Sequence, residues 1–398
     1  MKFIDGGVCA AQGFRAGGIH VGVKTRAAWK KDVALIVSDV ECAAAAVFTK
    51  NVVKAAPIHV DRRHLADGRA RAVIANSGNA NACAPNGEEN AERMCAAAAA
   101  AIGCAPEDVL VSSTGVIGQT LNVQVIENGI PELCRTLVHS AEGSDAAAHA
   151  IMTTDTVKKE AAVETSIGGK IVRIGGIAKG SGMIHPNMGT MLCFLTTDCD
   201  ISSEMIREAL LEVTRVSFNR ISVDGDTSTN DTCLVLANGL AGNPSITSQG
   251  ADYDAFLEAL RALCVEMARR IAADGEGAKH MITCTVEGAT DEAQAERIAK
   301  SVISSTLTKA AIFGADANWG RVLCAMGYSG EAFDPDKVDV SFISAAGSVA
   351  VCAQGRGLDF DEEAAKRILT EHDVTIAVAM GEGNGACTCW GCDITYDY

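Results

Sequence analysis

Aromatic side chains are scarce in this chain of 398 residues. Phe, Trp and Tyr together make up 4% of it, whereas 48% of its residues are hydrophobic. A core that has few large rings must be filled by small and branched side chains, here Ala, Val, Ile and Cys. The length is ample for a large core and suggests two or three domains of about 150 residues each.

Positive charge and long apolar runs are also in short supply. Lys and Arg number 34 against 50 Asp and Glu, which gives a net charge of −16 and argues against nucleic acid as a partner. Asp5 and two glycines interrupt the amino terminus before a signal-peptide core can form. No run approaches the roughly 18 apolar residues of a membrane span. We expect a cytoplasmic protein whose 16 cysteines are reduced.

One cysteine cluster has a spacing that could suit a metal ion. It consists of Cys387, Cys389 and Cys392. Neither a nearby histidine nor a second Cys-x-x-Cys pair completes a usual zinc pattern. The sequence therefore predicts neither a metal nor an organic cofactor.

A glycine-rich loop precedes Thr190, which opens the apolar run at 191–195. A threonine hydroxyl is a weak nucleophile without a base beside it, and its own α-amine can be that base once the preceding bond is cut. Gly189 has no Cβ to shield the carbonyl that would be attacked, and it can adopt strained backbone angles. The alternative is a glycine-rich turn that enters a buried strand. We hypothesise that Thr190 is a nucleophile and that the Gly189–Thr190 bond is its first target.

Six further segments carry unusual residue combinations along the chain: GFRA at 13–16, VFTK at 47–50, ANSGNANAC at 75–83, SSTGVIG at 112–118, SVDGDTSTNDT at 222–232 and WGCDITYDY at 390–398. Together with the Thr190 segment, and in this order, they resemble the ornithine acetyltransferase family, also called bifunctional glutamate N-acetyltransferases. The resemblance covers nearly the whole chain.

Acyl transfer through an ester develops an oxyanion, which needs hydrogen-bond donors. The segment at 112–115 can supply them, and its Thr114 hydroxyl and Gly115 N–H match the oxyanion pair of the family. Taken alone, this segment is an ordinary turn after a strand. The resemblance further implies that Lys179 and Thr153 contact substrate and that Glu276 pairs with the terminal ammonium of an ornithine chain. Without it, Lys179 and Glu276 would be read as solvated loop residues.

The resemblance implies a self-processing acetyltransferase of arginine biosynthesis. Cleavage before Thr190 would give an α fragment, 1–189, and a β fragment, 190–398. Thr190 would then carry the acetyl group from N2-acetyl-L-ornithine to L-glutamate in a ping-pong reaction. The alternatives are an aminopeptidase or amidase that uses water as acceptor, and a non-catalytic amino-acid-binding relative. The sequence leaves open whether acetyl-CoA is a second donor. The implied partners are the small substrates and the chain's own fragments in an α2β2 assembly, with no membrane.

Three positions depart from the family pattern. Gly189 stands where alanine is usual, and His185 replaces a small residue, so its role in local proton transfer is open. The sequence stops at Tyr398, where the family continues with residues that complete the substrate pocket.

Short apolar runs that end in Ser, Gly or Asn predict strands at 34–37, 72–75, 109–111 and 170–174. Apolar residues that return every three or four positions predict helices at 88–101, 203–213, 253–272 and 293–301. This irregular alternation favours an α+β fold. The resemblance implies a layered αββα-type sandwich, superficially like N-terminal nucleophile hydrolases, with a smaller carboxy-terminal α/β domain. A change in character near residue 281 divides the chain into a catalytic core, 1–280, and a carboxy-terminal domain, 281–398.

Overall fold

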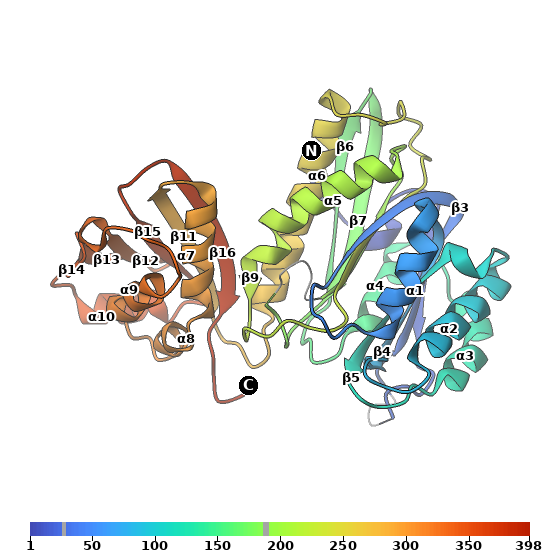
Figure 1. Cartoon of the computed structure of the whole chain (residues 1–398), viewed down its shortest axis with the longest axis horizontal. Helices are drawn as coiled ribbons and strands as arrows, with labels where there is room; N and C mark the ends of the chain where they lie inside the picture. Colours follow the sequence, from blue (N-terminus) through green and yellow to red (C-terminus); the bar gives the residue numbers. More distant parts are fainter. Residues whose placement is uncertain (26–28, 186–190) are drawn as a thin grey trace. The chain divides into compact units, whose positions relative to one another are not determined.

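The computed structural model describes residues 1–25, 29–185 and 191–398 and divides into two compact units (Figure 1). The first unit comprises residues 1–180, 186–219 and 227–267, and the second comprises 181–185, 220–226 and 268–398. The second unit thus takes in two short segments from the middle of the chain. The division at residue 280 that the sequence suggests stays a prediction.

The described residues of the first unit hold a nine-stranded sheet. Eight strands follow one another across it, in the order β1 (Lys2–Ile4), β6 (Lys159–Ile167), β7 (Lys170–Lys179), β8 (Leu192–Thr197), β10 (Thr232–Ala237), β3 (Val33–Phe48), β4 (Arg69–Asn79) and β5 (Val109–Val116). The ninth strand, β2 (Phe14–Ile19), pairs with β3. Two neighbouring pairs, β8 with β10 and β4 with β5, are parallel.

Strand β3 is buried on both faces. Ala34 and Ile36 belong to one apolar cluster, whereas Leu35 and Val37 belong to another. Because successive side chains point to opposite faces, a strand covered on both sides is apolar without interruption. This explains why the predicted strand at 34–37 stands out in the sequence.

Helices cover both clusters of the first unit. The cluster that contains Ile36 is closed by residues of α4 (Ala141–Ile151), and the one that contains Leu35 by residues of α2 (Gly87–Ile102) and α3 (Val123–Arg135). The other helices that begin in this unit are α1 (Ala56–His64), α5 (Ser203–Val216) and α6 (Ala251–Ala273). Short 3-10 turns lie at Gly7–Cys9, Leu65–Asp67, Pro106–Asp108 and Phe218–Arg220.

The described residues of the second unit hold a seven-stranded sheet, again mixed. Its order is β14 (Arg356–Gly357), β13 (Gly347–Ala353), β12 (Asp339–Ser344), β15 (Asp373–Ala379), β11 (Met281–Ala289), β16 (Gly385–Cys392) and β9 (Ile221–Ser222). Its helices are α7 (Glu292–Ser304), α8 (Thr306–Phe313), α9 (Trp319–Gly327) and α10 (Glu362–Leu369), with a 3-10 turn at Pro335–Lys337. Apolar residues of the strands and of α7 form one core, which includes Ile282, Ile298 and Phe342.

The predicted α+β class, with mixed sheets covered by helices, is confirmed. Each strand and helix segment predicted from the sequence lies within or overlaps an observed element of the same type. All sixteen cysteines fall in the described ranges and are free, with Cys83 and Cys324 exposed. Across the described ranges, no helix combines the length and the apolar character that crossing a membrane requires.

Candidate functional site

The end of β5 carries Thr114 and Gly115, the predicted oxyanion pair. The parallel register places Gly115 opposite Gly78 of β4. Gly115 has a φ of +131°, and a Cβ added there would lie 2.4 Å from the carbonyl carbon of Gly78. Side chains rarely adopt such backbone angles, and the neighbouring strand leaves no space for one. The conformation of this strand end therefore requires glycine.

An amide side chain from a distant segment fixes the same strand end. Asn230 Nδ2 donates to the carbonyl oxygen of Ser113 at 2.7 Å and to that of Ala80 at 2.6 Å. The Ser113 hydroxyl in turn donates to Asn76 Oδ1 at 2.6 Å. These buried bonds hold the peptide that precedes Thr114 in one orientation, which a set of donors aimed at a developing charge requires.

Lys179 lies at the end of β7, and a buried carboxylate connects it to the turn that carries Thr153. Asp155 Oδ1 accepts hydrogen bonds from Lys159 Nζ at 2.6 Å and from the N–H of Gly180 at 2.8 Å. Asp155 Oδ2 accepts the N–H of Thr153 at 2.9 Å. Asp155 thus binds the backbone of Thr153 and of Gly180, the residue that follows Lys179.

Charge explains why Asp155 is ionised in this buried place. Burial alone would raise the pKa of Asp155, but the ammonium groups of Lys179 and Lys159 outweigh burial and hold it below its ordinary value. Asp155, Lys159 and Lys179 are all buried. The cluster thus combines two lysines with one ionised carboxylate in the interior of the first unit.

Asp231 is a buried carboxyl that directly precedes strand β10. Burial raises the pKa of Asp231 well above its usual range, although the Ser228 side chain, Lys179 and the N–H of Met191 oppose this. The N–H of Thr232 also donates to the carbonyl oxygen of Met191 at 2.9 Å. Met191 follows Thr190 in the sequence, so Asp231 and Thr232 hold the chain directly after it.

Lys24, in the amino-terminal segment, contacts both Met152 and strand β4. Its ammonium donates to the carbonyl oxygens of Lys31 at 2.7 Å and Met152 at 2.8 Å. Its side chain also lies against Gly78, where an added Cβ would meet Lys24 Cγ at 2.8 Å. Burial lowers the pKa of Lys24 to about 8. Lys24 therefore joins the Thr153 turn to the strand that faces Gly115.

Glu276 belongs to the second unit. Its N–H donates to the carbonyl oxygen of Ser181 at 3.0 Å, and its carboxylate lies against Gly182. In the same unit, Asp224 accepts the N–H groups of Met183 at 2.5 Å and Ile184 at 2.9 Å. Thr114, Gly115, Thr153 and Lys179 thus belong to the first unit, whereas Glu276 belongs to the second. The predicted cleavage residues, Gly189 and Thr190, lie outside the described residues.

His185 and Tyr398, which depart from the family pattern, both lie in the second unit. His185 Nδ1 is 3.0 Å from the hydroxyl of Ser222. The Tyr398 hydroxyl donates to Asp224 Oδ2 at 3.0 Å. In the described parts of the chain, no cluster of three or more His, Cys, Asp or Glu is arranged to hold a metal ion, and this includes the thiols of β16.

Sequence reasoning missed the residues that support the site. These are Lys24, Asp155, Lys159, Asn230 and Asp231. Asn230 and Asp231 lie inside the motif at 222–232, which marked the segment without separating its members. Lys24 contacts Met152, 128 residues away, which its local spacing does not reveal. Lys159 and its partner Asp155 are only four residues apart, but nothing in that spacing marks the pair as buried.

The fold and these contacts define an α+β protein whose first unit presents a hydroxyl and a glycine N–H at a strand end, beside buried lysines. A model of the ArgJ family matches residues 15–398. The chain belongs to this family.

Two relatives match nearly the whole of this chain, and one solved structure matches about half of it. The arginine biosynthesis bifunctional protein ArgJ of Symbiobacterium thermophilum is 51% identical over 100% of this chain and 98% of its own length. ArgJ 1 of Clostridium acetobutylicum is 48% identical over 97% of this chain and 94% of its own. The crystal structure of ornithine acetyltransferase from Mycobacterium tuberculosis, complexed with ornithine, is 38% identical. It covers 47% of this chain and 98% of that one, with a TM-score of 0.43.

Proposed function

We propose that this protein transfers the acetyl group of N2-acetyl-L-ornithine to L-glutamate in arginine biosynthesis. Membership of the ArgJ family and the arginine-biosynthesis names of relatives that match 97–100% of the chain support this proposal. Within the molecule, the proposal rests on the end of strand β5 at Thr114 and Gly115. The backbone at position 115 requires glycine, and the Asn230 amide fixes the carbonyl of Ser113 just before Thr114.

The reaction proceeds in two acyl transfers. The Thr190 hydroxyl attacks the acetyl carbonyl, and its proton passes to the Thr190 α-amine. The oxyanion accepts hydrogen bonds from the Thr114 hydroxyl and the Gly115 N–H. The C–N bond to ornithine then breaks, the leaving nitrogen takes the proton, and acetyl-Thr190 remains. The amine of L-glutamate reverses these steps and leaves as N-acetyl-L-glutamate.

Lys179 and Thr153 bind the substrate in this proposal, and Glu276 binds the ammonium of the ornithine side chain. Lys179 is buried, and its positive charge helps to keep the Asp155 carboxyl ionised. A preorganised cation recognises a carboxylate at a lower entropic cost than a mobile one. No metal or organic cofactor takes part, and acetyl-CoA as a second donor is left to the assay below.

The free α-amine of Thr190 arises by self-cleavage. Thr190 attacks the carbonyl of Gly189, the peptide becomes an ester, and water hydrolyses it to give residues 1–189 and 190–398. The fragments remain together in the cytoplasm as an α2β2 assembly, as the family resemblance implies. Light scattering on the purified protein tests the assembly, since a mass of one α and one β fragment would contradict it.

The decisive experiment supplies N2-acetyl-L-ornithine with and without L-glutamate and measures N-acetylglutamate and free acetate. Formation of N-acetylglutamate, with an intact mass that shows acetylation of the Thr190 fragment, is the expected result. Acetate released at the same rate without glutamate would identify an amidase instead. A parallel reaction with acetyl-CoA as the only donor decides whether it is used. Thr190→Ala should give a single uncut chain that makes neither product.

A further inference from the structure

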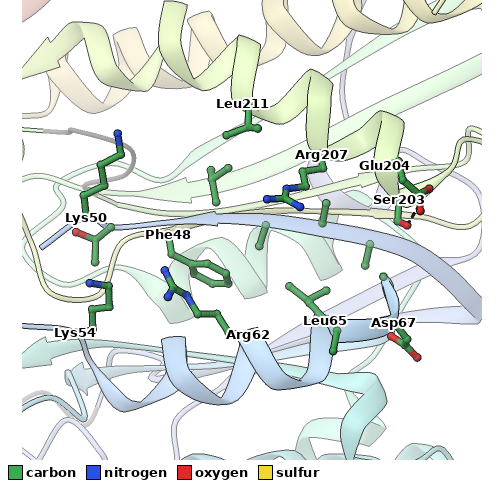
Figure 2. Close-up of a pocket in the computed structure, with 17 residues that line it drawn as sticks. Phe48, Lys50, Lys54, Arg62, Leu65, Asp67, Ser203, Glu204, Arg207 and Leu211 are labelled. Carbon is green, nitrogen blue, oxygen red and sulfur yellow. Dashed lines mark hydrogen bonds between the residues drawn. The ribbon is translucent and has the colours of Figure 1, made fainter. Parts of the chain in front are cut away.

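The first unit contains a cavity whose lining includes none of the site residues described above. It has a volume of about 780 Å³ and lies between the end of β3, helix α1 and helix α5 (Figure 2). Thr114, Thr153 and Lys179 do not line it. Small-molecule sites usually have volumes of about 300–1,000 Å³. The cavity therefore has the size of a site for a small organic molecule.

Small side chains on one face of β3 produce the hollow. Ala44, Ala46 and Phe48 line the cavity and share a face of the strand, because alternate residues point the same way. Leu65 and Leu211 close it from the two helical sides. The result is an apolar floor with room above the two alanines.

Four cations surround the Phe48 end of this floor. They are Lys50, Lys54, Arg62 and Arg207 (Figure 2). The guanidinium carbon of Arg62 is 5.6 Å from the centre of the Phe48 ring, and Lys54 Nζ donates to the carbonyl oxygen of Asn51 at 2.5 Å. Two of the four are thus already oriented by local contacts.

This concentration of positive charge is unusual for the chain. The protein as a whole carries a net charge of −16. The two acidic residues that line the cavity, Asp67 and Glu204, lie at its opposite end in Figure 2. Like charges grouped around a concave surface raise the local potential and concentrate ions of opposite sign. The Phe48 end of the cavity is therefore suited to anions.

We propose that this cavity binds a small organic anion that carries two or more phosphate or carboxylate groups. The charged groups contact Lys50, Arg62 and Arg207, and the remainder of the molecule lies over the alanines of β3. Guanidinium groups favour both kinds of anion because their N–H donors match two acceptor oxygens at once.

The proposal is tested by calorimetric titration of the full-length protein with pyrophosphate, citrate and ADP. We expect at least one of them to bind, and to bind more weakly at high salt, since Lys50, Arg62 and Arg207 are exposed to solvent. The paired substitution R62Q/R207Q should weaken that binding by about tenfold or more. The matched control is R135Q/K170Q, which removes two exposed cations of the same unit that do not line the cavity.

A milder variant protects the test against misfolding of the double variant. Lys50→Gln changes one exposed side chain and should weaken binding about threefold. Binding of pyrophosphate and ADP without citrate would assign the site to phosphates, and binding of citrate alone would assign it to carboxylates. Tighter binding of ADP than of pyrophosphate would show that the apolar floor takes part. The absence of binding by all three probes would overturn the proposal. So would equal losses in R62Q/R207Q and the control pair, because that result indicates a general charge effect.

Discussion

Asp155 Oδ1 lies 2.6 Å from Lys159 Nζ, and both side chains are fully enclosed within the first unit. The same carboxylate holds the N–H groups of Thr153 and Gly180, the residue that follows Lys179. One acidic residue thus neutralises a buried lysine and fixes two substrate-binding positions of the proposed site. Stability and substrate binding should both depend on it.

Asp155→Asn should lower the free energy of unfolding by about 3–5 kcal/mol, because it removes the buried carboxylate charge that pairs with Lys159 at 2.6 Å. Urea denaturation followed by circular dichroism measures the loss. The matched control is Asp145→Asn, which removes a half-exposed ion pair with Lys158 and should cost less than about 1 kcal/mol. Equal losses in the two variants would contradict the assignment of a buried ion pair.

Thr114→Ala should reduce the turnover of fully processed enzyme by about 10²–10³ while leaving the fold intact, because one oxyanion donor is removed. Thr114→Ser keeps the hydroxyl and should recover part of the rate. Thr120→Ala, on the exposed loop after β5, is the control and should not change turnover. The prediction is wrong if Thr114→Ala turns over at the wild-type rate.

Gly115→Ala should destabilise the protein by about 2–4 kcal/mol, since the new methyl group would overlap the backbone of Gly78 as well as strain φ. Gly118→Ala separates the two effects. Gly118 also has positive φ, +80°, but has open space around it, so only backbone strain of about 1 kcal/mol is expected. A similar loss in both variants, measured by chemical denaturation, would remove the steric argument.

His185 should make stability depend on pH. Burial, helped by the positive charge of Lys300, lowers the pKa of His185 from 6.5 to about 4. Between these two values the unfolded chain binds a proton that the folded chain does not, so the free energy of unfolding falls as the pH drops through this window. Above pH 6.5 the imidazole is neutral in both states, so the loss of stability caused by His185 is absent there and is complete only below about pH 4.

His185→Gln should flatten this part of the curve of unfolding free energy against pH. His372→Gln, which changes an exposed histidine in the same unit, provides the reference curve. Denaturation curves recorded across the window measure the slopes. Identical slopes for wild type and His185→Gln would show that other groups cause the pH dependence.

The sequence predicts elements well where local pattern and local structure agree. The sequence predicts a helix at 88–101, and helix α2 extends over Gly87–Ile102. The two agree because the acidic residues that begin the helix and the Gly103 that ends it are local signals. Strand β3 was predicted only at 34–37, although it continues to Phe48. Exposed Asp39 and Glu41 interrupt the apolar run there, and the pairing with β4 shifts register at the same place. A pattern of apolar residues therefore does not predict that the strand continues beyond such an irregularity.

The site is less accessible to sequence reasoning than the fold. Thr114 and Gly115 could be proposed from a motif, but the Asn230 amide that fixes them comes from 117 residues beyond Ser113. One of the two carbonyl oxygens that Lys24 contacts belongs to Met152, 128 residues away. Contacts of this range arise from strand order, which periodicity does not reveal. The supporting residues therefore became visible only in the folded chain.

The strand order of the first unit bears on what happens to a chain cut before Thr190. Strands β8 and β10 follow that bond, yet they lie between β7 and β3, which precede it. Antiparallel ladders of six residue pairs join β8 to β7 and β10 to β3. The two pieces would consequently be interleaved, with the strands of one inserted into the middle of the other's sheet. Neither piece could close that sheet by itself, so the processed protein would be an obligate complex whose halves part only when both unfold.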